Sequence, residues 1–260
     1  MPEPGDRHVL LLREGTDVKD VERLVRDRYP NAELRDDGAV RLNVATRLSA
    51  PSRLQAAAVP GAPAQWSLAM AVEGPADTDV LDLLRGLARR LGGAVRVAGS
   101  GEVVVPRPED VVDVVVHGPS WLDPPTVLSL VATDHPEARL ATEGEQWLDP
   151  TSDSVKDAYA VVLDLGPGGR DGVVEVIVHV DEEPEPAIAT RDWAEDAVAY
   201  WVRWTPQHPP PAGPEPPSPE VSNARRRAAV AVSRIARVLA DATGGVAVDA
   251  DGFLLDDYRL

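Results

Sequence analysis

The sequence predicts an α+β protein made of two copies of one β-α-β-β-(β)-α-β unit, with the helices packed on one face of a mainly antiparallel sheet. Three observations predict it: a segment that occurs twice, helical patterns in matching positions, and short apolar runs typical of strands. A ferredoxin-like or related unit is the expected topology. A single continuous sheet shared by both halves is the alternative.

The repeated segment is the first sign of duplication. Pro, Ala, Leu and Gly recur at the same places in "RYPNAELRDDG", residues 28–38, and in "DHPEARLATEG", residues 134–144, at an offset of 106 positions. An internal match at a fixed offset predicts a tandem duplication.

A strand and a helix precede the repeated segment in each half. The apolar runs "HVLLL" and "VVDVVV" predict buried strands. Helical spacing of apolar residues then predicts helices over residues 16–29 and 123–135. Thr16 or Asp17 can cap the first of these helices, and Asp123, followed by two prolines, can cap the second.

A second pair of helices ends the two copies. Apolar stripes predict amphipathic helices over residues 77–91 and 219–243, and the alternating runs "WSLAMAV" and "AVAYWVRW" predict a strand before each of them. Each helix is followed by Gly-Gly, of which Gly92 or Gly244 can take the left-handed conformation that ends a helix.

The second copy is longer than the first. Aligning the two Gly-Gly pairs requires an offset of 152 rather than 106 positions, so the second copy carries additional residues in its middle. We expect an inserted hairpin at residues 158–180, because Gly-rich turn residues separate two apolar runs, and a Pro-rich loop at residues 205–220.

Charge divides the chain in the same way. We expect a near-neutral first copy over residues 1–106, with net charge −1, and a strongly acidic second copy over residues 107–260, with net charge −16. Residues 143–196 alone hold 15 acidic and 3 basic side chains. Such a field repels nucleic acid phosphates and attracts a basic protein. We therefore expect a basic protein partner and no nucleic acid; the alternative is that the acidic surface serves only solubility.

The composition also bears on the compartment. No apolar run approaches the roughly 18 residues that a membrane span needs, and the N-terminal residues lack the pattern of a secretory signal. We expect a cytoplasmic protein with no membrane partner. The sequence has no cysteine, which excludes disulfides, thiolate catalysis and Cys-ligated zinc, and its 24 Arg against 2 Lys indicate a GC-rich bacterial genome.

The remaining motifs lack the spacing of catalytic or metal sites. The Gly-rich run at residues 166–172 precedes a strand rather than a helix, which predicts a hairpin turn and not a phosphate loop. "VDADGFLLDD" has the carboxylates of a calcium loop without their spacing. His179 shares a strand face with Glu175 and Asp181, but no second histidine stands at a ligand spacing. We expect no catalytic residue, no metal, no cofactor and no small-molecule ligand.

Aromatic residues stand inside or beside the acidic stretch. Because Trp is enriched at the energetic centres of protein interfaces, this combination predicts a surface that contacts a basic protein. The candidate partner-binding residues are Trp193, Trp201, Trp204, Asp181, Glu182, Glu183 and Glu185. Trp201 and Trp204 face opposite ways on a strand, so one is expected to be buried.

The run "NARRRAAVAVSRIAR" places several arginines on the last predicted helix. We expect Arg225, Arg226, Arg227, Arg234 and Arg237 to form a solvated face that pairs with carboxylates, because apolar residues fill the other side of the helix. The alternative is that they bind an acidic ligand.

Taken as a sequence, the chain predicts a non-enzymatic, acidic protein-binding module. Its concrete form is a cytoplasmic antidote, of the immunity type, that neutralises a basic toxin or nuclease, since an acidic patch that covers a basic active site gives both affinity and fast association. Two alternatives stay open: a structural component of a larger protein assembly, and an enzyme of unidentified class with its site in the second half.

Overall fold

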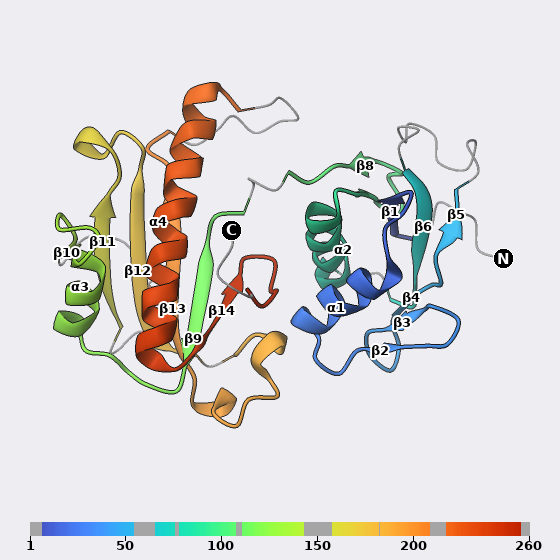
Figure 1. The fold of residues 1–260 in the computed structure, drawn as a ribbon, viewed down its shortest axis with the longest axis horizontal. Helices are drawn as coiled ribbons and strands as arrows, with labels where there is room; N and C mark the ends of the chain where they lie inside the picture. The colour runs from blue at the N-terminus through green and yellow to red at the C-terminus, as the bar shows by residue number, and fades with distance from the viewer. Residues whose placement is uncertain are drawn as a thin grey trace. The chain divides into compact units, whose positions relative to one another are not determined.

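The computed structural model describes residues 7–54, 66–75, 78–107, 111–142, 158–181, 183–208 and 217–255 (Figure 1). The chain forms two compact units, one of Met1–Asp110 with Asp251–Phe253 and the other of Val111–Ala250 with Leu254–Leu260. The described residues contain four α-helices and two antiparallel sheets, which confirms the predicted α+β class.

The first unit consists of short strands around two helices. Its elements are β1 (Val9–Arg13), α1 (Val18–Arg28), β2 (Glu33–Leu34), β3 (Val40–Arg41), β4 (Arg47–Leu48), β5 (Ser52–Arg53), β6 (Trp66–Glu73), α2 (Thr78–Leu91), β7 (Ala94–Arg96) and β8 (Val103–Val104). The sheet runs in the order β2-β3-β4-β6-β1-β7-β8, and β5 pairs with β6.

Both helices of the first unit lie on the same face of its sheet. Successive residues of a strand point to opposite faces, and Leu10 and Leu12 of β1 join one hydrophobic cluster with the buried residues of α1 and α2. Val9 and Leu11 belong to a smaller cluster on the other face, with Trp66. The apolar stripe of each helix therefore determines which side of the sheet is the main core.

Phe253 completes that main core, although it lies near the other end of the chain. Its side chain is fully buried, and a Cβ atom on Gly86 would lie 2.4 Å from its ring, so α2 needs glycine at this position. The guanidinium carbon of Arg90 lies 4.0 Å from the ring centroid, and the carboxylate of Asp251 accepts hydrogen bonds from Arg89 and Arg90. The first unit thus depends on residues distant in sequence.

The second unit has longer strands. Its elements are β9 (Val114–Gly118), α3 (Pro124–Ala132), β10 (Arg139–Leu140), β11 (Tyr159–Asp164), the 3-10 turn η3 (Pro167–Gly169), β12 (Val173–Val180), the 3-10 turns η4 (Pro186–Ile188) and η5 (Ala194–Asp196), β13 (Val198–Thr205), α4 (Pro219–Thr243) and β14 (Val246–Asp249). The sheet runs in the order β10-β11-β12-β13-β9-β14.

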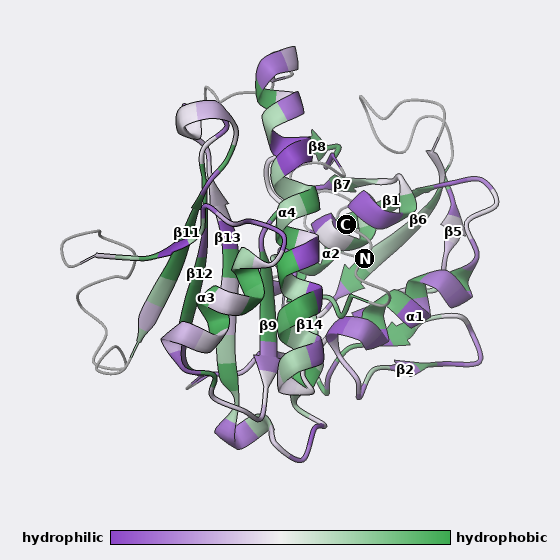
Figure 2. Ribbon diagram, turned by 60° about the vertical axis from the view of Figure 1, so that its left-hand side comes forward, coloured by the Kyte–Doolittle hydropathy of each residue, from purple (hydrophilic) through white to green (hydrophobic). Residues whose placement is uncertain are grey.

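One face of the second sheet carries α3 and α4. Alternate residues of β9, β11, β12 and β13 form a large core with the stripes of both helices; the strand residues include Val114, Val116, Val176, Tyr200 and Val202. Strands β9 and β12 are mostly hydrophobic, whereas α4 alternates between hydrophobic and hydrophilic patches, as expected of a helix with one buried side (Figure 2).

The helix ends follow local chemistry. The side chain of Asp17 accepts a hydrogen bond from Lys19 N, and that of Asp123 accepts one from Thr126 N, at 2.9 Å in both cases. Hydrogen bonds from the side chain and then the backbone N–H of Thr126 hold the pKa of Asp123 below its usual value. Helix α3 ends at Ala132, three residues before the expected His135. Gly244 ends α4 in the left-handed conformation, with φ 66°.

The inserted part is partly described. Strands β11 and β12 pair from Tyr159↔Val178 to Asp164↔Val173 and form a hairpin. The central residues of the Pro-rich loop at 205–220 lie outside the described residues, as do Asp77, Asp256 and Asp257.

Phe253→Ala is expected to destabilise the protein by about 3–5 kcal/mol, because it removes a buried ring and leaves a cavity beside Gly86. Urea unfolding of the full chain measures this change, and hydrogen exchange should show faster opening in α2. The exposed Val105 is the control, since Val105→Ala should change stability by less than about 0.5 kcal/mol. Parent-like unfolding of Phe253→Ala would contradict the assignment of this ring to the core.

Leu87→Ala and Leu239→Ala should each cost about 2–5 kcal/mol, because both side chains are fully buried under their sheets. Val230→Ala, at a position of α4 that is 51% exposed, provides the matched control. If thermal unfolding of the two leucine variants coincided with that of the parent, the packing of α2 and α4 described here would be wrong.

Candidate functional site

The second sheet has a face that neither helix covers. Residues that alternate with the core positions point to it, and the central ones on β9, β12 and β13 are Val115, His117, Glu175, Ile177, His179, Ala199, Trp201 and Arg203. We call these eight residues the open face. Strand β13 runs through it between β12 and β9, so Trp201 stands opposite Ile177 on one side and Val115 on the other.

Trp201 is the large apolar residue exposed on the open face. Its exposed fraction is 39%, and its ring meets that of His179 edge to face, with 4.8 Å between centroids. The Nδ1 atom of His179 lies 2.8 Å from the carbonyl oxygen of Val180. Because a carbonyl oxygen only accepts hydrogen bonds, Nδ1 carries the proton in this arrangement.

Charged residues lie at one end of the open face. Arg203 Nε donates to Glu175 Oε2 at 3.0 Å, and the nearby carboxylate of Asp113 accepts a hydrogen bond from Trp204 N at 2.7 Å. Burial raises the pKa of Asp113 above its usual value, and the hydrogen bond from Trp204 opposes part of that rise. Among the described residues, this end thus holds two carboxylates and one guanidinium.

A close contact between a histidine and a carboxylate lies at the other end. His117 is 2% exposed, and its Nδ1 atom lies 2.7 Å from Asp181 Oδ2. Asp181 is the residue that follows β12, and its backbone N–H donates to Ala197 O at 2.9 Å, just before β13 begins. The pair therefore fixes the base of the connection between these strands.

That connection, residues 181–197, carries the highest density of acids in the described part of the second unit; we call it the acidic loop. Its apolar residues turn inward, where Ala187, Ile188 and Ala197 form a buried cluster with Val248 of β14, while Trp193 packs against this cluster. Four of its acids are exposed and form no ion pair with any described residue: Glu183, Asp192, Glu195 and Asp196. The loop therefore combines an apolar anchor with an outward acidic surface.

The remaining candidate residues have varied environments. Glu185 is half-buried, and Glu182 lies outside the described residues. Trp204 is 9% exposed and belongs to the helix-side core, where its Nε1 donates to Asp171 O at 2.8 Å. Of Trp201 and Trp204, the second is thus the buried one.

Sequence reasoning missed a loop, residues 120–122, that two tyrosines hold by hydrogen bonds; we call it the tyrosine-held loop. The Tyr200 hydroxyl donates to Ser120 O at 2.6 Å and accepts from Leu122 N at 2.9 Å, while the Tyr159 hydroxyl donates to Leu122 O. Trp121, between these anchored residues, is 39% exposed. Burial raises the pKa of both tyrosines. Tyrosines in apolar strands are ordinary core residues, so no sequence signal distinguishes these two.

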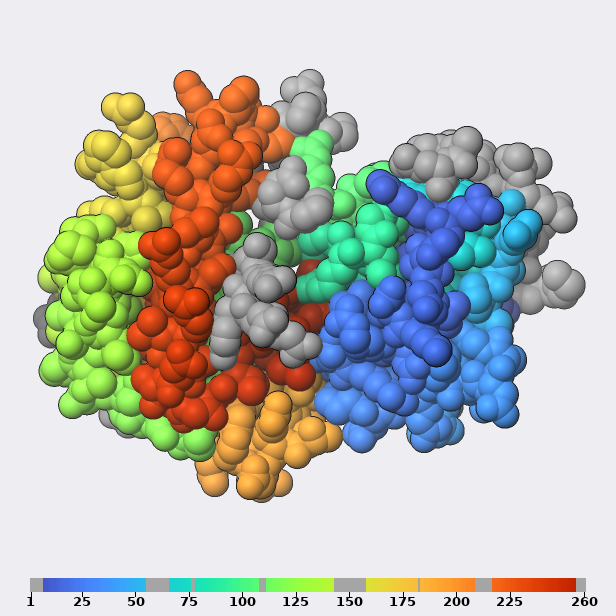
Figure 3. Space-filling model, viewed as in Figure 1, coloured from blue at the N-terminus to red at the C-terminus, as the bar shows by residue number. Residues whose placement is uncertain are grey.

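A hollow of about 560 Å³ lies at the head of α4, between the hairpin turn and the end of β13. Arg227 forms a two-pronged ion pair there with Asp171, at 2.6 and 2.7 Å, and Arg170 lies on the rim. One arginine of the basic run is thus paired with a carboxylate. Helix α4, coloured orange to red, lies beside the green α3 on the face of the molecule that Figure 3 shows.

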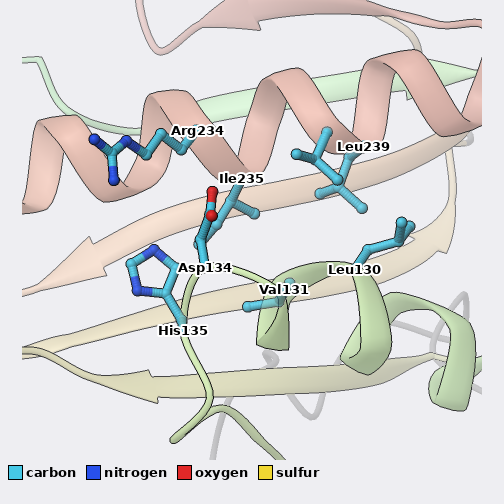
Figure 4. A pocket seen from close by; sticks show the side chains of 8 residues that line it. Leu130, Val131, Asp134, His135, Arg234, Ile235 and Leu239 are labelled. Atoms are coloured by element: carbon cyan, nitrogen blue, oxygen red, sulfur yellow. The ribbon is translucent and has the colours of Figure 1, made fainter.

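The groove between α3 and α4 is much smaller. Leu130, Val131, Ile235 and Leu239 line it, and Asp134, His135 and Arg234 stand at one end (Figure 4). Its volume of about 10 Å³ holds at most one water molecule. This groove offers no room for an organic ligand.

Comparison of the chain with protein-family models, with curated proteins and with solved structures found no match. Among the described residues, no group of three or more His, Asp or Glu side chains is arranged to hold a metal ion. Within the same residues, no helix combines the length and apolar character needed to cross a membrane. The geometry of the open face and the acidic loop therefore carries the functional argument.

Asp181→Asn should destabilise the protein by about 1–3 kcal/mol, because it removes the carboxylate that lies 2.7 Å from the buried ring of His117. Glu183→Gln, two residues further on, removes an exposed charge and should change stability by less than about 0.5 kcal/mol. Urea unfolding of both variants measures the difference. Equal stability would mean that the pair does not hold the base of the loop.

Proposed function

We propose that this chain is a non-enzymatic, acidic protein-binding module whose second unit contacts a basic protein through the acidic loop and the open face. Its concrete form is a bacterial antidote that neutralises a basic toxin or nuclease. Such a protein would act in the cytoplasm, a compartment that suits a cysteine-free chain.

The acidic loop is the observation that carries the proposal. An acidic surface that serves solubility needs no fixed shape. In this loop Glu195 and Asp196 stand on the 3-10 turn η5, and buried Ala187 and Ile188 of η4 anchor the loop to the cluster beneath it. Their positions are set before a partner arrives, so little conformational freedom is lost on binding.

Electrostatics supports the same reading. The exposed acids of the loop have no cation among the described residues to neutralise them, and Arg191 is the one basic residue of the loop. A concentrated negative field raises the association rate of a basic protein by about 10- to 1000-fold at low salt. It also disfavours acidic proteins and nucleic acids.

Trp201 supplies the apolar contact that charges alone do not. An exposed indole near the centre of a sheet face is typical of the anchor residues that set dissociation rates. Trp193 and Trp204 act through packing in this proposal: Trp193 against the cluster beneath the loop, Trp204 within the core.

We also propose that the two units arose by tandem duplication of one β-α-β-β-(β)-α-β unit, ferredoxin-like or related. The order β2-β3-β4-β6-β1-β7 in the first sheet and β10-β11-β12-β13-β9-β14 in the second supports this proposal, since the same succession of elements produces both. In this alignment β11 and β12 take the places of β3 and β4, so the second unit has a longer form of the same hairpin. The binding proposal does not depend on this origin.

Association kinetics test the binding proposal. A basic nuclease or toxin that binds the purified chain is selected from a panel of purified basic proteins, and its association rate is measured at rising salt. The loop variant carries Glu183→Gln, Asp192→Asn, Glu195→Gln and Asp196→Asn. It leaves Asp181 intact because the carboxylate of that residue is half-buried against His117. We expect it to associate about tenfold more slowly at low salt, with the difference vanishing at high salt.

The control neutralises four exposed acids of the first unit, Glu14, Asp20, Asp36 and Glu102. It changes the net charge by the same amount as the loop variant, so we expect less than about a twofold effect on association if position matters more than total charge. Equal slowing by both variants would refute a docking role for the loop. Absence of any basic binder in the panel would count against the proposal as a whole.

A further inference from the structure

We infer that the open face binds a guanidinium group of the partner, stacked on the indole of Trp201 beside the carboxylates of Glu175 and Asp113. This inference rests on the proposed function, because the partner is taken to be the basic protein that the acidic loop attracts. It specifies which basic side chain the site selects: arginine over lysine.

The indole is available for such a contact. Trp201 is 39% exposed, and within the described part of the chain its one ring contact is with His179. Elsewhere the protein already pairs its arginines with rings, since Arg28 lies over Tyr29 and Arg90 over Phe253. In the described ranges, no such cation lies over Trp201.

The indole is also held in place. Ile177, fully buried, and Val115 flank it on the neighbouring strands, and the edge-to-face contact with His179 restricts its rotation. His179 in turn is oriented by its bond to Val180 O. A ring fixed in this way binds a planar group with little loss of side-chain entropy.

Glu175 and Asp113 lie beside Arg203, two positions along β13 from Trp201, and their charges favour a cation with several donors. Glu175 receives one bond from Arg203 and Asp113 one from Trp204 N, yet a carboxylate offers about four acceptor positions. A guanidinium stacks flat on an aromatic face while its edge donates to carboxylates, whereas an ammonium is a compact and strongly hydrated charge. The open face therefore matches arginine better than lysine.

Peptide probes of equal charge test this selectivity. The full chain is titrated by calorimetry with two peptides of about eight residues, one of arginines and one of lysines. We expect the arginine peptide to bind more tightly. Trp201→Leu, which keeps an apolar side chain but removes the ring, should reduce the ratio of the two affinities about fivefold.

Trp121→Leu is the matched control, because Trp121 is also 39% exposed but lies on the tyrosine-held loop. It should leave the affinity ratio unchanged. The loop variant should weaken both peptides by the same factor. An affinity ratio that Trp201→Leu does not alter would overturn the inference, even if the loop variant still weakens binding.

Peptide binding by the loop variant distinguishes failure of the proposed function from failure of the arginine-site inference. If the loop variant binds both peptides as the parent does, the proposed function fails, whatever happens at Trp201. If Trp201→Leu does not fold, the parent labelled with ¹⁵N-tryptophan replaces it, with the Trp201 indole signal assigned through Trp201→Phe. That signal should shift with the arginine peptide and much less with the lysine peptide; equal shifts would overturn the inference.

Discussion

The position of both helices on one side of the second sheet is the constraint on which the rest of this unit depends. A sheet has two faces, and the long strands β12 and β13 place apolar residues on both of them. Helices α3 and α4 pack on one of these faces. On the other face, Val246 and Val248 of β14 are packed against the loop that connects β12 to β13.

This cover explains why the acidic loop has a defined shape. Ala187, Ile188 and Ala197 gain stability by burial against β14, and that gain orders a segment whose composition would otherwise favour an extended, solvated chain. The His117–Asp181 pair closes the same loop at its base. Stability and candidate function are therefore linked. The residues that pack against β14, Ala187, Ile188 and Ala197, also hold the acidic loop and its carboxylates in place.

Local features of the structure could be predicted from the sequence, whereas contacts between distant residues could not. The caps at Asp17 and Asp123, the left-handed Gly244 and the β11–β12 hairpin all follow from a few neighbouring residues. The alternation of a strand also required Trp201 and Trp204 to face opposite ways. Which of the two is buried depends on the face that the helices cover, and only the folded arrangement decides that.

The candidate site shows the same division. Composition identified the acidic stretch and its aromatic residues, but it ranked Asp181 with the surface acids. The structure separates this residue from its neighbours, because its carboxylate faces a histidine on a strand 64 positions earlier in the chain. Four exposed carboxylates within residues 183–196 repel one another, a cost that a purely solubilising surface avoids by spreading its charges. The proposed basic partner would relieve this repulsion on binding, which is why the concentration of acids on an anchored loop supports that proposal over solubility alone.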